Sequence, residues 1–242
     1  MSDRQQHWQQ VYDSRDVSEV SWFQDEPSVS LRLVESVADP SCTVVDVGGG
    51  ASLLVDALVV RGFTDLTVVD VSQRALDIVR ARLDSHGIRV TMVESDIVEW
   101  DPSRTFDVWH DRAAFHFLTD NDSRARYVDL VARSVVPGGS LIVATFATDG
   151  PTHCSGLEVA RYSAAELTAQ FAAHFTLVAD EREEHCTPSG ALQMFTWVVL
   201  RRDSHGPTRP AGKVRLARAI TLRGGGVDVP PAELLGCLVR VA

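Results

Sequence analysis

Three aspartates follow apolar stretches of this chain, in positions where carboxylates could hold a ligand. The first, Asp46, closes the run 43–47 just before three consecutive glycines at 48–50. A short apolar run followed by glycines predicts a buried strand that enters a tight turn. Apolar residues then recur with helical spacing over 53–61. The segment therefore predicts a strand, a glycine turn and a helix, as in sheets that bind nucleotide cofactors.

The glycine turn also distinguishes between two kinds of cofactor. The dinucleotide fingerprint G-x-G-x-x-G needs a third glycine, where this chain has Leu53. The Asp46 carboxylate would repel a pyrophosphate, whereas it suits a cation such as the ammonium group of an amino acid. S-adenosylmethionine carries such an ammonium and no phosphate. The turn therefore favours this cofactor, and an NAD(P)-dependent enzyme is the weaker alternative.

Two later acids extend the pattern. Asp70 ends the next apolar run, 20 residues after Gly50, where an acid can accept hydrogen bonds from ribose hydroxyls. Asp96 follows a third run and could accept a bond from an adenine amino group, with Ile97 against the ring. Each acid alone is more typical of a helix cap or a solvated turn. Because parallel strands end at one edge of a sheet, the three acids together predict a cofactor site.

The elements that must position these acids follow from periodicity. Strand-like runs alternate with helical spacing up to about residue 175, which predicts a parallel sheet with crossover helices. The last two runs, 175–179 and 192–200, lie too close together for a crossover helix. They should therefore pair antiparallel.

Composition shifts indicate three parts. We expect an N-terminal helical cap over 1–38, the cofactor-binding domain over 39–202, and a flexible or loosely docked tail over 203–242. The tail begins with a stretch rich in Pro, Gly and Ser, which is typical of a linker. Its own three glycines lack a strand–turn–helix context, so they predict no nucleotide site.

Charge and cysteine content narrow the function further. The 242 residues carry a formal net charge of −10, which disfavours nucleic acid and anionic membranes as partners. The four cysteines are far apart, as expected in a reducing cytoplasm, and no apolar run approaches the ~20 residues of a membrane span. The N-terminus predicts no signal peptide. These features predict a cytoplasmic protein, and the excess of Arg over Lys hints at a GC-rich bacterial genome.

The order of the motifs resembles that of the class I S-adenosylmethionine-dependent methyltransferases. The resemblance covers about residues 20–201 and departs from the family at Ser52, where another glycine is usual. It rests on D-V-G-G-G at 46–50, V-V-D-V-S at 68–72, E-S-D-I at 94–97, F-D-V-W-H-D at 106–111 and P-G-G-S-L-I-V at 137–143.

This resemblance implies an α/β fold, the Rossmann-like methyltransferase fold. Its doubly wound, mostly parallel seven-stranded sheet contains one antiparallel strand. The glycine turn would lie near the methionine part of S-adenosylmethionine, the second acid at the ribose and the third at the adenine. The implied cofactor residues are Asp46, Gly48, Gly49, Gly50, Asp70, Val71, Asp96, Ile97 and His110.

The remaining candidates follow from methyl transfer itself. The methyl group of a sulfonium is already activated, so positioning supplies most of the rate, and a base is needed only for an acceptor that is protonated at neutral pH. Loops at the carboxyl edge of the sheet should supply the groups that meet the acceptor. We expect catalytic or orienting roles for Asp111, His116 and His153, and acceptor contacts from Trp22, Phe23 and Phe115.

Several alternatives stay open at this point. Asp111 could simply bond a backbone amide, and His116 lies in an apolar run typical of a core histidine. The pairs at 153–154 and 185–186 offer two His and two Cys, the ligand types of zinc, but adjacent ligands without the usual spacings predict no metal site. The acceptor is expected to be a small molecule; a protein lysine and a non-catalytic, cofactor-binding role are the alternatives. The protein should be a monomer or a homodimer.

Overall fold

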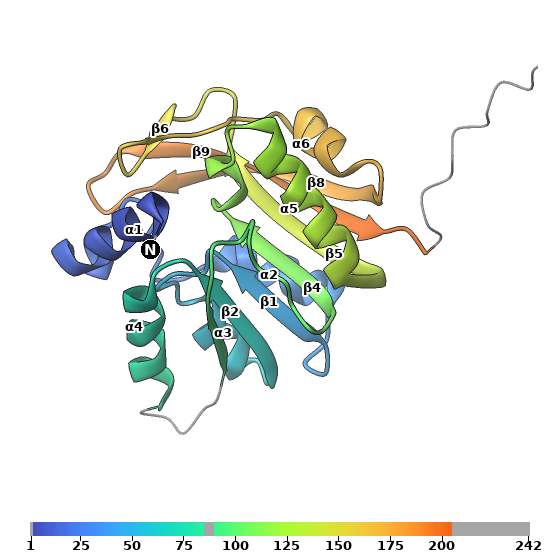
Figure 1. Ribbon diagram of the computed structural model, residues 1–242, viewed down its shortest axis with the longest axis horizontal. Helices are drawn as coiled ribbons and strands as arrows, with labels where there is room; N and C mark the ends of the chain where they lie inside the picture. Colours follow the sequence, from blue (N-terminus) through green and yellow to red (C-terminus); the bar gives the residue numbers. More distant parts are fainter. Residues whose placement is uncertain (1, 85–89, 205–242) are drawn as a thin grey trace, which may run out of the picture. The chain divides into compact units, whose positions relative to one another are not determined.

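A seven-stranded sheet forms the centre of the computed structural model, which describes residues 2–84 and 90–204 (Figure 1). The strand order is β3-β2-β1-β4-β5-β9-β8, and β9 is antiparallel to both of its neighbours while the other pairs are parallel. The predicted fold class is confirmed. The strands are β1 (Thr43–Val47), β2 (Asp65–Asp70), β3 (Thr91–Glu94), β4 (Phe106–Arg112), β5 (Val135–Phe146), β8 (Phe175–Cys186) and β9 (Leu192–Arg202).

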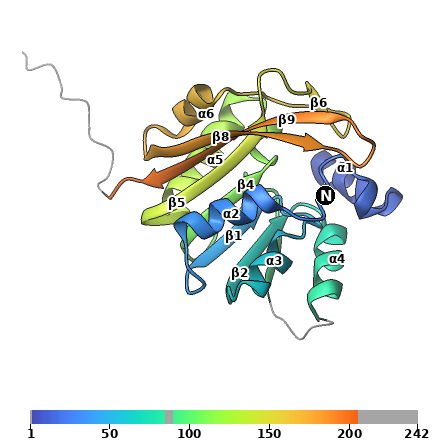
Figure 2. The same cartoon turned by 180° about the vertical axis from the view of Figure 1, so that it is seen from behind.

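Helices cover both faces of this sheet because its strands are apolar on both sides. One face packs against α2 (Ser28–Val37), α3 (Leu54–Val60) and α4 (Gln73–Asp84). Figure 2 shows these helices in front of the strands. The other face packs against α5 (Asn121–Ser134) and α6 (Ala164–Phe171). Along β4 successive side chains alternate between the two cores, with Val108 on the α2 side and Trp109 on the α5 side.

The predicted cap region contains two helices with different positions. Helix α1 (Asp3–Ser14) begins at Ser2, whose hydroxyl accepts a hydrogen bond from the backbone N–H of Gln5. It crosses to the ends of β2 and β3, where Arg4 pairs with Asp96 at 3.1 Å. Helix α2 instead packs on the sheet face, in the same core as α3. The predicted tail, apart from its first two residues, lies outside the described residues.

Two local predictions were wrong. The segment expected to be a loop around His153 forms a short hairpin of β6 (His153–Cys154) and β7 (Leu157–Glu158). Its turn residues, Ser155 and Gly156, both have positive φ, at 50° and 81°, as tight hairpin turns require.

The second error concerns the last pair of strands. The predicted runs 175–179 and 192–200 leave His185 and Cys186 in the connection between them, but β8 continues through Cys186 and pairs along β9. The charged sequence of this part of β8 concealed the strand, because β8 is an edge strand whose side chains are largely exposed. Among the described residues, we find no helix that combines the length and apolar character needed to cross a bilayer.

Candidate functional site

The first cavity lies at the carboxyl ends of β1 to β4, beneath α1. The structure brings five of the predicted cofactor residues to it, from three successive strand ends. It also receives aromatic side chains from α1, from the segment before α2 and from the segment after β4. The predicted residues among its lining are Gly48, Asp70, Val71, Asp96 and Ile97.

Asp70 is the most buried acid of this cavity, with 8% of the residue exposed. Its Oδ1 accepts a hydrogen bond of 2.7 Å from the backbone N–H of Ser72. Burial raises the pKa of Asp70 to about 6, although the backbone amides of Ser72 and Gly50 act in the opposite direction. An acid in this position can accept further hydrogen bonds from a bound ligand.

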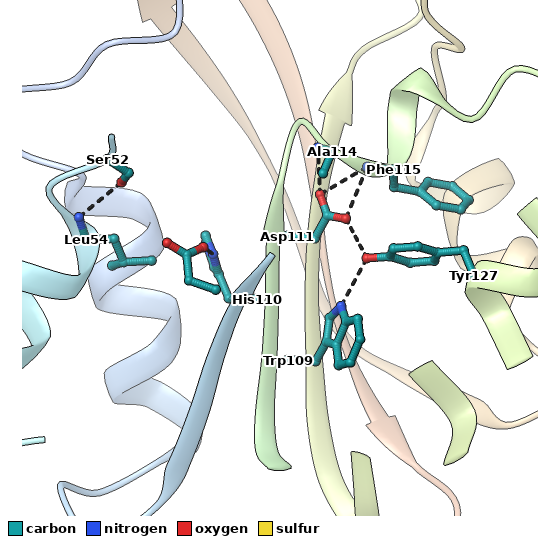
Figure 3. Close-up of polar contacts among 9 residues, drawn as sticks. Ser52, Leu54, Trp109, His110, Asp111, Ala114, Phe115 and Tyr127 are labelled. Atoms are coloured by element: carbon teal, nitrogen blue, oxygen red, sulfur yellow. Dashed lines mark hydrogen bonds and ion pairs between the residues drawn. The ribbon is translucent and has the colours of Figure 1, made fainter. Parts of the chain in front are cut away.

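Neighbouring side chains leave no room for a Cβ atom at Gly49 or Gly50 in the glycine turn. A Cβ atom at Gly50, whose φ is +51°, would lie 2.3 Å from the hydroxyl oxygen of Tyr12 in α1. A Cβ at Gly49 would lie 2.6 Å from Oδ2 of Asp46. Two residues after Gly50, the hydroxyl of Ser52 accepts a hydrogen bond of 3.0 Å from the N–H of Leu54 (Figure 3).

A second cavity lies on the other side of the glycine turn. Its wall includes Asp46, Gly48, Gly49, His110 and Phe23, all predicted site residues, together with Trp22, which also lines the first cavity. Asp46 and His110 form a buried pair, with 2.7 Å between Oδ1 and Nδ1. The Asp46 carboxylate is therefore engaged by His110, while Gly50 lines neither cavity.

Asp111 lies on the opposite side of β4 from His110 (Figure 3). It is fully buried, and its carboxylate accepts hydrogen bonds from the N–H groups of Ala114 and Phe115 and from the hydroxyl of Tyr127. Burial raises its pKa to about 6, against the effect of the Tyr127 hydrogen bond. Asp111 lines neither cavity. Its position is that of a group that fixes the segment after β4.

Three further predicted residues also lie away from both cavities. Phe115 is fully buried beside Tyr127 and Phe171. His116 is fully buried against Phe146, and burial, with a smaller effect of Arg112, lowers its pKa to about 3.

His153 is exposed on β6, where its Nδ1 lies 3.0 Å from the Thr152 hydroxyl. None of the three predicted catalytic residues therefore reaches the cavities. Among the described residues, no group of three or more His, Cys, Asp and Glu side chains is arranged to hold a metal ion.

The most important cavity residue that sequence reasoning missed is Arg112. It lines both cavities, and its guanidinium is buried. Its Nη1 donates to the backbone carbonyl of Trp22 at 3.1 Å, and the guanidinium lies over the ring of Phe195. Burial lowers its pKa, while Glu183 acts in the opposite direction. The available signal was its place directly after the fourth predicted strand, at the same edge as the acids.

Comparison with known proteins agrees with this geometry. Residues 44–139 match a family model described as a methyltransferase domain. One curated relative is the ubiquinone biosynthesis O-methyltransferase of Rickettsia conorii, which is 23% identical over 119 residues. The aligned region covers 49% of this chain and 40% of the relative.

Solved structures share the fold at low sequence identity. One is the 1,6-didemethyltoxoflavin-N1-methyltransferase of Burkholderia thailandensis, which was solved with 1,6-didemethyltoxoflavin and S-adenosylhomocysteine. It is 22% identical to this chain, with a TM-score of 0.67, and the alignment covers 83% of this chain and 87% of that chain. The N-methyltransferase NodS of Bradyrhizobium japonicum WM9, solved with S-adenosylhomocysteine, is 17% identical with a TM-score of 0.63, over 80% of this chain and 97% of its own. The chain thus contains a region similar to a methyltransferase domain, and it shares the fold of methyltransferases that were solved with S-adenosylhomocysteine.

Proposed function

We propose that this protein transfers a methyl group from S-adenosylmethionine to a small-molecule acceptor. The observation that carries the proposal is the first cavity, where the glycine turn and the acids after β2 and β3 meet. Asp70 would accept hydrogen bonds from the ribose hydroxyls, and Asp96 with Ile97 would hold the adenine.

The second cavity would take the methionine end of the cofactor. It starts at the same turn and contains the buried Asp46–His110 pair. The pair would provide negative charge near the ammonium group, while His110 keeps the carboxylate oriented. When bound, the cofactor supplies a methyl group on a positively charged sulfur.

The acceptor would occupy the part of the first cavity beyond the glycine turn. Trp22, Phe117 and Cys154 line this end, while Arg4 of α1 lies beside Asp96 at the cofactor end. Reaction requires the acceptor atom in line with the methyl–sulfur bond at about 3–3.5 Å. Burial raises the pKa of the Cys154 thiol to about 12, so this thiol stays protonated and is a poor base. The protein's main contribution is thus positioning and exclusion of water.

A small acceptor is supported by the form of the site and by the relatives. Aromatic side chains from α1, from the segment before α2 and from the segment after β4 close around the cavity. The names of one curated relative and of one structural neighbour refer to small-molecule methylation, namely ubiquinone biosynthesis and 1,6-didemethyltoxoflavin. Neither name identifies the acceptor of this chain.

Calorimetry and labelling test the proposal in two steps. The purified full-length protein should bind S-adenosylhomocysteine and not NADH. Incubation with methyl-labelled S-adenosylmethionine and a cell extract should then place the label in the small-molecule fraction. Label in protein would instead indicate a lysine methyltransferase, and cofactor binding without any transfer would indicate a non-catalytic protein. Tight binding of NADH alone would contradict the cofactor assignment.

A further inference from the structure

Arg112 lines both cavities, and its side chain also contacts the two strands at the far edge of the sheet. Its guanidinium carbon lies 4.5 Å from the ring centroid of Phe195 on β9, and its Nε lies 3.8 Å from Oε2 of Glu183 on β8. Both strands follow β4 and β5 in the sheet order, whereas β1, β2 and β3 lie on the other side of β4. The guanidinium therefore lies between the second cavity, which Asp46 also lines, and the strands β8 and β9 on the side of β4 away from β2 and β3.

Two donors of this guanidinium have no partner in the described part of the chain. Nε and Nη2 are buried and make no hydrogen bond, since Nη1 alone donates to the Trp22 carbonyl. Glu183 forms an ion pair with the guanidinium, but at 3.8 Å its Oε2 lies beyond hydrogen-bond distance of Nε. The two oxygens of Glu183 instead accept 2.8 Å hydrogen bonds from the Gln24 amide and the Trp197 indole. Buried donors without partners are unfavourable, and a ligand that brings acceptor oxygens or a negative charge would satisfy them.

Aromatic rings flank the same end of the first cavity. Trp8 packs edge-on against both Trp22 and Phe117, with ring centroids 5.6 Å and 5.2 Å apart, and all three line the cavity. The acids that line this cavity, Asp70 and Asp96, both belong to the cofactor end. The acceptor end thus combines flat apolar walls with a cation and offers no carboxylate as a base.

We propose that Arg112 selects an aromatic acceptor that binds as an anion, through an ionised oxygen or sulfur. This inference rests on the proposed methyltransferase function and names the acceptor class of that site. The anionic atom attacks the methyl carbon, the new carbon–oxygen or carbon–sulfur bond forms as the old carbon–sulfur bond breaks, and the electron pair of the broken bond stays on the cofactor sulfur. The two opposite charges disappear together, so no proton has to be removed during transfer.

The test compares anionic probes with neutral probes of the same shape. Full-length protein saturated with S-adenosylhomocysteine is titrated by calorimetry with 4-nitrophenolate, 4-nitrobenzenethiolate and 4-nitroanisole at a pH where the first two are ionised. Wild type should bind at least one anion at least about tenfold more tightly than the neutral ether, the range expected of a charge-assisted hydrogen bond. Arg112→Met should abolish this preference, and Arg112→Lys should retain part of it.

The matched control is Arg104→Met, because Arg104 is an exposed arginine at the opposite end of β4 that pairs with Asp65. It should leave both the preference and the affinity for S-adenosylhomocysteine unchanged. A melting curve will show whether Arg112→Met folds. If it does not, Arg112→Lys is compared with wild type instead. An Arg112→Lys protein that prefers the anions as strongly as wild type would contradict the specific role of the guanidinium.

Two other results would overturn the inference. Wild type that binds no anion more tightly than the ether has no anionic acceptor site. An Arg112→Met protein that loses affinity for S-adenosylhomocysteine but keeps affinity for 5′-methylthioadenosine, which lacks the amino-acid end, would assign Arg112 to the cofactor carboxylate. Failure of the wild type to bind S-adenosylhomocysteine would instead contradict the proposed function itself.

Discussion

The carboxyl edge of the sheet has two halves that differ in charge and in how the chain builds them. In the half that we propose for the cofactor, called the cofactor half below, the ends of β1, β2 and β3 bring together the acids Asp46, Asp70 and Asp96. In the half that we propose for the acceptor, called the acceptor half below, Arg112 at the end of β4 brings a guanidinium that pairs with Glu183 and lies over the ring of Phe195. Each acid lies at or just beyond the carboxyl end of its own strand, whereas Arg112 contacts residues 90 and 71 positions away. Short motifs thus build one half, and long-range packing builds the other.

Two adjacent residues of β4, His110 and Asp111, also differ in whether their side chains reach a cavity. His110 points toward Asp46 and the second cavity, while Asp111 points into the core beneath α5. Alternation along a strand dictates that adjacent side chains take opposite sides. Which side faces a cavity depends on the helices and segments that pack there.

The largest expected effect lies in the cofactor half. Asp70→Ala removes two expected hydrogen bonds to ribose hydroxyls, each worth about 1.5–3 kcal/mol. Affinity for S-adenosylhomocysteine should fall at least about 100-fold by calorimetry. Asp65→Ala, at the other end of β2, is the control and should bind normally. Wild-type affinity in the Asp70 variant would show that the ribose lies elsewhere.

The next largest effect tests whether Asp111 supports the core or takes part in the reaction. Asp111→Ala leaves the Ala114 and Phe115 amides and the Tyr127 hydroxyl without their acceptor. Unsatisfied buried donors should lower the free energy of unfolding by about 3 kcal/mol, and the melting temperature by roughly 6–12 °C. Calorimetric melting measures this. A variant of wild-type stability that loses turnover alone would return Asp111 to the catalytic group, as the sequence predicted.

A third prediction uses the pH dependence of stability. The pKa of His116 falls from 6.5 to about 3 in the folded protein, chiefly because the ring is buried. Its stabilising contribution is therefore complete above pH 6.5 and is lost as pH falls toward 3, by about 1.4 kcal/mol per pH unit. His116→Phe removes this loss.

Denaturant titrations at pH 6.5 and 4.5 should show that wild type loses about 2–3 kcal/mol more than His116→Phe between the two conditions. The raised pKa values of Asp70 and Asp111 act in the opposite direction, because those groups lose stabilisation as pH rises from 3.8 to about 6. They are present in both proteins, so their effect cancels in the difference. Equal losses would mean that His116 is protonated without cost in the fold.

The smallest effect concerns the contact between α1 and the cofactor half. Arg4 pairs with Asp96, the acid expected to accept the adenine amino group, so the ion pair competes with the cofactor. Arg4→Gln should tighten binding of S-adenosylhomocysteine by up to about fivefold, because partly exposed ion pairs are worth about 0–1 kcal/mol. Arg32→Gln, which breaks the exposed pair with Glu181, is the matched control. Weaker binding in Arg4→Gln would show that Arg4 holds the cofactor instead.

The sequence by itself determined the succession of strands and helices along the chain, and it predicted the acids that meet in the cofactor half. Strand, turn and helix follow one another within a few tens of residues around Asp46, Asp70 and Asp96, so periodicity and spacing carry the necessary information. The close pairing of the last two strands was evident for the same reason, since their short connection excludes a crossover helix.

Only the tertiary structure decided the acceptor half. The roles of Asp111 and His116 depend on burial by Tyr127 and Phe146, which the chain supplies from elsewhere. The exposure of His153 depends on a hairpin whose two-residue strands are too short to show a pattern. Arg112 became a candidate binding group because Trp22, Glu183 and Phe195 meet around it and leave two of its donors unused. Such sites arise from contacts between distant segments, and local sequence patterns do not encode which segments meet.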